Sequence, residues 1–392
     1  MELITLKEAF DTVMRSAFST GTETVDFTDS LDRVLAADIK SDIDMPPFNK
    51  STVDGFACRK ADLNSELELI ETIAAGTKPE KKLAEKQCSR IMTGAPLPDG
   101  ADVVFMVENS DIRNSKVKFT GSFTKDNISR KGEDFKNGQI VIESGKLIKP
   151  QDIALMASSG DTSVAVGRKP SIGVISSGDE LVEPSEKPGI AEIRNTNSYQ
   201  LMAQIKRAGA SGKYYGIVRD NAAAIYEIVK SAIDENDIVL ISGGVSMGEF
   251  DFVPSVLERA GVKILFSRIN VQPGKPTTFG VHPNAIVFGL PGNPVSSFIQ
   301  FELLVRPLIS RMMGHEFKPV TFPAKIENSF SRKNAERHGI IPVKIKEHGV
   351  VDPVEYHGSA HLSAITEADG IIELLPGEKT IMKGEVVSVR QI

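Results

Sequence analysis

The sequence has no tryptophan and only two cysteines in 392 residues. Cys58 and Cys88 are too few for a disulfide framework or a cysteine metal cluster, and they suit a reducing compartment, so we expect a cytoplasmic protein. No run of about 18 apolar residues is present, which predicts no membrane-spanning helix. The N-terminal stretch MELITLKEAFDTV has acids from position 2 and no apolar h-region, which argues against a signal peptide.

A basic field is also missing, because the formal net charge is -6. A role in nucleic-acid binding is therefore not expected. There is no Walker A motif, which excludes an ordinary phosphate-loop NTPase, and there is no convincing nucleophile–base set of a serine hydrolase. The hydrophobic fraction of 41% and the charged fraction of 25% are those of a globular protein.

A chain of this length is too long for one ordinary core, so we expect several domains. Residues 5–18 have helical apolar spacing, with Thr5 as a cap and Glu8 three residues later. Residues 31–40 predict a second short helix or a passage from helix to strand. The stretch DMPPFNKSTVDGFA is rich in proline and polar residues and predicts a loop at a domain junction.

The type of secondary structure that the sequence predicts then changes twice. Short β-like runs separated by Gly, Asn and Pro fill the region from about 55 to 145, and a helix with Pro at its start and Gly at its end follows at 150–160. Apolar strands alternate with helices over 171–314, which argues for a parallel sheet with helices on both faces. We predict four parts: a linking N-terminal domain of residues 1–42 with 140–170, a β-rich inserted domain of residues 43–139, an α/β domain of residues 171–316, and a C-terminal β-domain of residues 317–392.

Ligands of open parallel sheets bind at the carboxyl ends of the strands, so the residues that follow each strand carry the chemistry. Each of the four expected strands ends in glycine, in a carboxylate, or in both. These ends are Gly178-Asp179-Glu180, Arg219-Asp220-Asn221, Gly243-Gly244-Val245-Ser246 with Asp251 beyond, and Pro291-Gly292-Asn293-Pro294. Their convergence at one edge predicts a ligand site there.

The residue types suit an anionic ligand. Gly243 and Gly244 allow close backbone approach and can present N–H groups to an anion. The carboxylates of Glu180, Asp220 and Asp251 could hold a hard cation that bridges to phosphate. Lys275, in the Pro/Gly turn QPGKPTTFG, could reach an oxyanion.

Plainer interpretations of the same residues stand beside this one. Asp251 and Asp220 could each cap the helix that follows, the glycine pair could serve only a tight turn, and Lys275 could be solvated. His357 and His361 have the spacing of a zinc pair, but their stretch is not convincingly helical and no third ligand is near.

Eight segments together resemble the molybdopterin molybdenumtransferase family, which includes the E domains of gephyrin and of the plant molybdenum cofactor synthesis protein. The resemblance covers nearly the whole chain. The segments, in chain order, are PPFNKSTVDGFA, MTGAPLPDGAD, RKGEDF, SSGDEL, GGVSMGEFD, QPGKPTTFG, LPGNPVSSF and AITEADGIIELLPG.

This resemblance implies an elongated, multidomain α/β plus β subunit with a molybdopterin-binding-like α/β domain, a β-rich insert and a C-terminal β-barrel-like domain. It implies a homodimer whose site is shared between subunits, without nucleic acid or membrane. It further implies that adenylylated molybdopterin binds with Mg²⁺, molybdate enters, AMP leaves and molybdenum ends on the dithiolene sulfurs. A molybdopterin adenylyltransferase and proteins of molybdoenzyme maturation are the expected protein partners.

Roles carried over by motif fall into three groups. Asp220 and Asp251 would serve the metal or the pterin phosphate, with Glu180 nearby and Lys275 facing oxyanions. Asp54, Thr93 and Asp134 would reach in from the other subunit. The ligand would be bound by Gly243, Gly244, Ser246, Arg268, Pro291, Pro294, Arg337 and Ser359.

The sequence departs from the family pattern at two positions. Gln272 stands where many members have lysine, so one positive charge is missing, and Phe56 replaces a tyrosine. Two other functions stay open on the residues: an adenylyltransferase acting on molybdopterin or a nucleotide, and a non-catalytic carrier or scaffold. Clustered like charges at the strand ends argue against the scaffold, because such charges destabilise one another when close.

Overall fold

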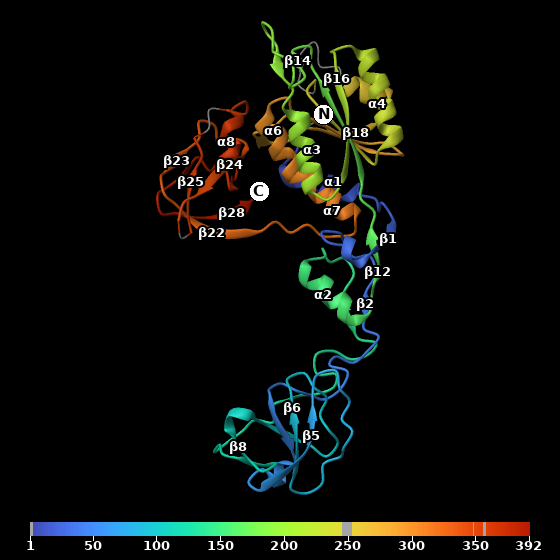
Figure 1. The fold of residues 1–392 in the computed structure, drawn as a ribbon. Helices are drawn as coiled ribbons and strands as arrows, with labels where there is room; N and C mark the ends of the chain where they lie inside the picture. The colour runs from blue at the N-terminus through green and yellow to red at the C-terminus, as the bar shows by residue number, and fades with distance from the viewer. Residues whose placement is uncertain (1–2, 245–252, 348, 356–357) are drawn as a thin grey trace. The chain divides into compact units, whose positions relative to one another are not determined.

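The computed structural model describes residues 3–244, 253–347, 349–355 and 358–392. The chain divides into two compact units (Figure 1). One contains residues 1–23, 32–36 and 165–392, and the other contains residues 24–31 and 37–164. None of the helices within the described residues has the length and apolar character needed to cross a membrane.

A six-stranded sheet forms the centre of the α/β domain in the first unit. Its strand order is β16-β13-β17-β21-β20-β18. The strands are β13 (Ser171–Ser177), β16 (Ser211–Val218), β17 (Ile238–Ser242), β18 (Lys263–Phe266), β20 (Thr278–Val281) and β21 (Ile286–Leu290). The first four in spatial order are parallel, as the sequence predicts.

The other two strands correct the prediction of a fully parallel sheet. Strand β20 runs antiparallel to β21, and β18 runs antiparallel to β20. The link from β20 to β21 is the short turn at His282–Ala285, where the backbone N–H of His282 donates to the carbonyl of Ala285 at 2.8 Å. A turn this short can only reverse the chain, because a parallel connection needs a dozen or more residues.

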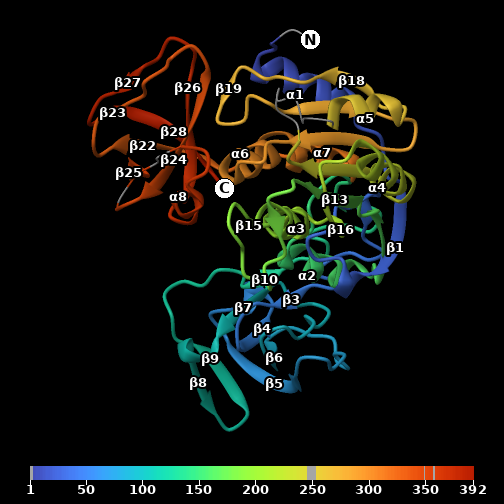
Figure 2. The same cartoon turned by 90° about the horizontal axis from the view of Figure 1, so that it is seen from above.

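Helices cover both faces of this sheet, as Figures 1 and 2 show. Helices α4 (Ala222–Glu235) and α5 (Val253–Arg259) pack on one face through a core that includes Ile175, Val229 and Ile241. Helices α3 (Asn197–Arg207) and α6 (Pro294–Gln300) lie on the other. All five residues of β17 are buried, as expected for a strand covered on both sides.

The last helical stretch of the α/β domain is interrupted before Pro307. After α6 the chain forms a π-helical turn, η4 (Phe301–Val305), and then α7 (Arg306–Met312). Pro307 has no N–H and its ring clashes with the preceding turn, so the regular hydrogen-bond ladder cannot continue through it. Glu302 in this turn is buried and forms ion pairs with Arg207 at 2.5 Å and Arg306 at 2.9 Å.

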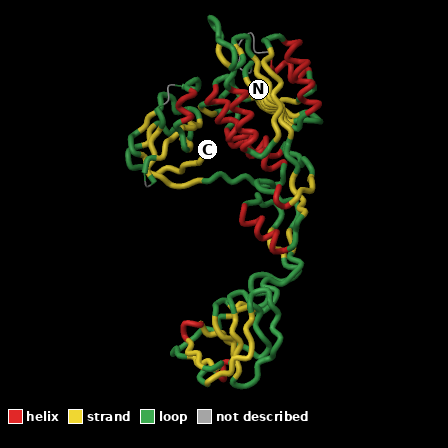
Figure 3. The backbone as a smooth tube through the Cα atoms, viewed as in Figure 1, coloured by secondary structure: helices red, strands yellow, loops and turns green. Residues whose placement is uncertain are grey.

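The C-terminal domain is a closed five-stranded barrel. Its strands are β22 (Thr321–Ile326), β24 (His338–Ile345), β25 (Val350–Pro353), β26 (Gly370–Leu374) and β28 (Val386–Gln391), with pairing of β24 to β26 closing the ring. Figure 3 shows strands and loops predominating in this domain beside the short helix α8 (Leu362–Thr366). The short strand β19 (Val271–Gln272) joins β24 in parallel at His338–Gly339. The barrel-like domain expected from the sequence is confirmed.

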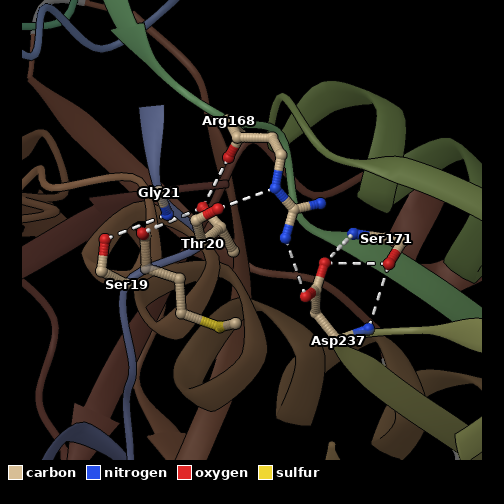
Figure 4. Close-up of polar contacts among 7 residues, drawn as sticks. Ser19, Thr20, Gly21, Arg168, Ser171 and Asp237 are labelled. Atoms are coloured by element: carbon tan, nitrogen blue, oxygen red, sulfur yellow. Dashed lines mark hydrogen bonds and ion pairs between the residues drawn. The ribbon is translucent and has the colours of Figure 1, made fainter. Parts of the chain in front are cut away.

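An arginine fixes the start of the α/β sheet (Figure 4). Arg168 donates from Nε to the carbonyl of Thr20 at 2.7 Å and from a terminal nitrogen to Asp237 at 3.1 Å. The Asp237 carboxylate also accepts from the backbone N–H and the hydroxyl of Ser171, both at 2.8 Å. The residues before β13 and β17 are thereby held in register with the N-terminal segment.

The second unit contains the expected β-rich domain. Its six strands, in spatial order, are β7 (Val103–Met106), β4 (Gly55–Cys58), β6 (Gln87–Ile91), β5 (Glu66–Ile73), β9 (Lys116–Phe119) and β8 (Ser110–Arg113). Cys58 and Cys88 lie opposite each other on β4 and β6 and are both buried and free. Burial raises the pKa of each thiol to about 12, so neither is a reactive nucleophile.

The remaining elements of this unit are short. They are β2 (Ile39–Lys40), β3 (Lys50–Ser51), β10 (Ile128–Ser129), β11 (Ile140–Ile142), α2 (Pro150–Ser159), and the 3-10 turns Phe27–Asp29, Lys60–Asp62 and Val107–Asn109. Helix α2 starts at proline and ends at Gly160, whose φ is +89°, as the sequence predicts. Strands β1 (Thr22–Asp26) and β12 (Ser163–Gly167) each contain a passage of the chain from one unit to the other.

The N-terminal helix α1 (Leu6–Arg15) has the predicted capping box of Thr5 and Glu8. Two predictions nearby hold only in part. Residues 31–40 form no helix, because Asp32 adopts φ +61° in a turn and Leu35 instead bridges to Val166, although they do lead into strand β2 at Ile39–Lys40. The predicted loop over DMPPFNKSTVDGFA ends in strand β4, whose short apolar stretch Gly55–Cys58 is wholly buried between β6 and β7.

Candidate functional site

The carboxyl ends of the parallel strands open on a cavity of about 570 Å³. Its lining comes from the ends of β13 and β17, the turn after β21, the parallel pair of β14 (Leu181–Val182) and β15 (Ile193–Arg194), the start of α3, and the C-terminal domain. A pocket of this size lies in the range of small-molecule and cofactor sites. Its place in the sheet is the one predicted.

Gly243 is required by the backbone at the end of β17. Its φ is +97°, and a Cβ added there would lie 2.2 Å from the carbonyl oxygen of Ser177. Gly244 has φ +63°. The two turns of the site are in contact, because a Cβ on Gly292 would meet the Cα of Gly243 at 3.7 Å. The glycines therefore serve close backbone packing between two strand-end turns, and not the tight turn alone.

Asp220 contacts a serine that lines the cavity and does not cap the following helix. The cap of α4 is Asn221, whose side chain accepts from the backbone N–H groups of Ala223 at 3.0 Å and Ala224 at 3.1 Å. The carboxylate of Asp220 accepts instead from the hydroxyl of Ser177 at 2.7 Å, and Ser177 lines the cavity. The capping interpretation of Asp220 is thus wrong.

The C-terminal domain is joined to the turn after β21 through Ser359. Asn293 donates from Nδ2 to the Ser359 hydroxyl at 2.8 Å, and the backbone N–H of Val295 donates to the Ser359 carbonyl at 3.2 Å. Pro294 begins α6 and lines the cavity, and Pro291 is buried beside it. Ser359 therefore reaches this edge of the sheet from a domain more than 60 residues along the chain.

A network of polar side chains extends from the cavity lining at Ser176 and Asn195. The Ser176 hydroxyl donates to Asn195 Oδ1 at 3.0 Å, and Asn195 Nδ2 donates to the Tyr214 hydroxyl at 2.8 Å. Tyr214 in turn donates to Glu183 at 2.8 Å. Burial, followed by the Glu183 hydrogen bond, raises the pKa of Tyr214 above its ordinary value, so this hydroxyl stays a donor at neutral pH.

The other candidates of the first unit lie in different places. Glu180 lines the cavity directly. Lys275 is partly buried, and its carbonyl accepts from Ile269 and Thr277, while the Arg268 carbonyl accepts from Ile4. Arg337 precedes β24 and accepts through its carbonyl from Arg332 at 2.6 Å. Lys275, Arg268 and Arg337 are not lining residues of this cavity.

Two predicted site residues, Ser246 and Asp251, lie outside the described residues, as does His357 of the possible zinc pair. Within the described parts of the chain, no three His, Cys, Asp or Glu side chains form a cluster that could hold a metal ion. The exposed Gln272 lies on β19, where it pairs with Gly339 of the barrel.

Asp54 and Thr93 of the second unit form a pair. The Asp54 carboxylate accepts from the Thr93 backbone N–H at 2.7 Å and from its hydroxyl at 2.8 Å. The backbone hydrogen bond, and then the hydroxyl one, lower the pKa of Asp54 below its ordinary value. Asp134 is exposed, and its backbone N–H donates to the carbonyl of Met45 at 2.9 Å.

Several residues that build the cavity could not be singled out from the sequence. Ser177 and Ser242 are the last residues of β13 and β17, and Asn195 and Asn197 lie just before and at the start of α3. One signal was available, because two consecutive polar residues, Ser176 and Ser177, follow four apolar or glycine residues at the end of β13.

Comparison with known protein families places the α/β domain that carries this site among the molybdopterin-binding-like domains. Residues 173–311 match a family model described as a probable molybdopterin binding domain. Residues 4–160 match the MoeA N-terminal region (domain I and II), and residues 325–392 match the MoeA C-terminal region (domain IV). The chain belongs to the molybdopterin molybdenumtransferase family, whose members are transferases of molybdenum cofactor biosynthesis.

Similar proteins cover nearly the full chain. A molybdopterin molybdenumtransferase of Staphylococcus epidermidis is 35% identical over 98% of this chain and 95% of the relative. One from Bacillus subtilis is 34% identical over 94% of this chain and 89% of the relative. A crystal structure of a molybdopterin biosynthesis moeA protein from Pyrococcus horikoshii OT3 aligns with a TM-score of 0.88 and 29% identity over all of both chains. The resemblance predicted from the eight segments is confirmed.

Proposed function

We propose that this protein inserts molybdate into adenylylated molybdopterin with the help of Mg²⁺ and releases AMP. The carrying observation is the convergence of Ser177, Gly243 and Asn293 on one cavity, with the Asp220 carboxylate one hydrogen bond away. Cleavage of the bond between the two phosphates consumes a water molecule and frees AMP. Formation of the molybdenum–sulfur bonds expels oxygen from molybdate as water or hydroxide.

The site chemistry suits two anions that must approach each other. Mg²⁺ usually takes one or two carboxylates together with substrate phosphates and water, and the oxygen donors of Asp220 fit this pattern. Asp220 would hold the ion together with Asp251. When bound, the ion would offset the charge of the phosphates. The glycine turns, through their backbone N–H groups, would bind an oxyanion close to the chain.

The residues of the second unit would act on a neighbouring subunit. Asp54, Thr93 and Asp134 belong to family motifs, and we assign them to the site of the partner in a homodimer. The low pKa of Asp54 keeps its carboxylate charged at neutral pH. We place the protein in the cytoplasm, where it would receive its substrate from an adenylyltransferase and deliver the product to proteins of molybdoenzyme maturation.

The test is AMP release from adenylylated molybdopterin with Mg²⁺, with and without molybdate. Wild-type protein should release AMP only when molybdate is present, and Asp220→Ala and Asp251→Ala should lose most of this rate. Asp234→Ala is the matched control, because Asp234 is an exposed aspartate on α4 of the same domain. Equal rates for Asp220→Ala and Asp234→Ala would remove Asp220 from the site.

The same assay separates the rival functions. Consumption of ATP by the protein alone would favour an adenylyltransferase. Release of AMP that does not depend on an oxyanion would indicate a hydrolase. No release at all would leave a carrier of the pterin cofactor.

A further inference from the structure

Asn197 lines the cavity and makes hydrogen bonds to residues at the ends of two different strands. It is the first residue of α3, and only 7% of it is exposed. Its Nδ2 donates to the Ser242 hydroxyl at 2.7 Å and to the Gly292 carbonyl at 2.8 Å. These two acceptors belong to different turns, one after β17 and one after β21. A single amide group therefore holds both ligand turns against the start of a helix.

The orientation of this amide is fixed by its surroundings. The Gly292 carbonyl can only accept a hydrogen bond, so the group that faces it must be the Nδ2 of Asn197. Its Oδ1 is buried and has no hydrogen-bond partner among the described residues. A buried acceptor without a partner is costly in a folded protein, and a donor group of a bound ligand would offset that cost.

We propose that Asn197 is a ligand-positioning residue of this cavity, an assignment that rests on the proposed function. Its Nδ2 sets the spacing between the turn at Ser242–Gly243 and the turn at Gly292–Asn293. Its Oδ1 accepts from an N–H or O–H donor of the bound pterin nucleotide. Adenylylated molybdopterin carries both kinds of donor, on its pterin ring and on its ribose. Asn197 touches no reacting atom in this arrangement and so governs binding more than turnover.

The same domain offers a matched control at the opposite end of the sheet. Asn236 precedes β17 and is 6% exposed. Its Nδ2 also makes two hydrogen bonds, to the Ala232 carbonyl and to the Tyr215 hydroxyl, both at 2.8 Å. Replacement of either asparagine by alanine removes two hydrogen bonds from a buried amide. The stability losses should therefore be similar, and only the effect on the ligand should differ.

The experiment compares Asn197→Ala, Asn197→Ser and Asn236→Ala with the wild type. Binding of adenylylated molybdopterin is measured by calorimetry without molybdate, KM and kcat by AMP release with molybdate, and folding by thermal unfolding. We expect both Asn197 variants to weaken binding and raise KM by about tenfold, as for the loss of about one net hydrogen bond. Their kcat should change less than KM, and Asn236→Ala should bind like the wild type.

Each other outcome has a defined meaning. Wild-type binding by both Asn197 variants would overturn the proposal, and so would equal weakening by Asn236→Ala. Failure of both Asn197 variants to fold, while Asn236→Ala folds, would make Asn197 a folding determinant and also overturn it. If the wild type itself neither binds the ligand nor releases AMP, the proposed function fails first, and this inference fails with it.

Discussion

Removal of the buried carboxylate of Glu302 should destabilise the α/β domain strongly. The side chain is 1% exposed and accepts from Arg207 and Arg306, and from Gln204 at 2.7 Å. Loss of one partner of a buried ion pair costs about 3–5 kcal/mol. The two arginine side chains are 43% and 25% exposed and can partly rehydrate, so Glu302→Ala belongs near the lower limit, at about 3 kcal/mol.

Because the protein has no tryptophan, its intrinsic fluorescence comes from tyrosine, and this makes unfolding of the first unit measurable by itself. The protein has five tyrosines, all between positions 199 and 356, and therefore within the first unit. Tyrosine fluorescence in urea thus follows unfolding of that unit alone. With a urea dependence of about 2–3 kcal/mol per M, a loss of about 3 kcal/mol lowers the midpoint by about 1 M or more. The bond from Arg390 to the Glu302 carbonyl, at 2.5 Å, survives the substitution because it uses the backbone.

Two further variants make this prediction refutable. Glu302→Gln keeps the shape and one acceptor, so its loss should be smaller than that of Glu302→Ala. Glu258→Ala removes an exposed carboxylate on α5 and should change the free energy of unfolding by less than about 0.5 kcal/mol. If Glu302→Ala costs no more than Glu258→Ala, the cluster is not a stabilising element and the reasoning fails.

Two other predictions use residues of the sites. Gly243→Ala should cost about 1–3 kcal/mol and abolish molybdate-dependent AMP release, because the added Cβ meets the Ser177 carbonyl at 2.2 Å and φ is +97°. Gly216→Ala is the control, since Gly216 also has a positive φ but open space at its Cβ. Equal losses of activity in the two variants would contradict the steric argument. Thr93→Val should raise the pKa of Asp54 by removing the hydroxyl donor, as NMR titration of the carboxyl would show. Because the pKa of Asp54 is lower in the folded state than in the unfolded state, its ionised carboxylate stabilises the fold above the unfolded-state pKa, and this stabilisation is lost as pH falls through the folded-state pKa. Thr93→Val should therefore lose the stabilisation at a higher pH than the wild type. An unchanged pKa of Asp54 in this variant would refute the role of Thr93.

The sequence predicted most where periodicity or capping chemistry is strong. The parallel strands β13, β16, β17 and β21, helix α4 and the capping box at Thr5 all have local signals that tertiary structure does not oppose. The short strand β4 was not predicted, because four residues beside a polar, proline-rich stretch are too few to show the hydrophobic alternation of a strand. Its pairing with β6 and β7 is a long-range effect, which local reasoning cannot see.

The site was predictable at the level of turns, and less so at the level of contacts. The rule that ligands bind at strand ends placed Glu180, Gly243 and Pro294 at the cavity. It could not show that Asn293 meets Ser359, because that contact joins domains far apart in the chain. Nor could it choose between Asp220 and Asn221 as the cap, since both residue types are good caps.

The division of roles between these two neighbours carries the functional argument further. Asn221 alone satisfies the N–H groups at the start of α4, so the helix does not need the carboxylate beside it. Asp220 nevertheless keeps its carboxylate partly buried against Ser177, and its backbone N–H donates to the Asp179 carboxylate at 3.2 Å. A carboxylate that is free of the capping role is available as an oxygen ligand for a hard cation bound with an anionic substrate. The proposed function therefore gives Asp220 a chemical role that helix capping does not.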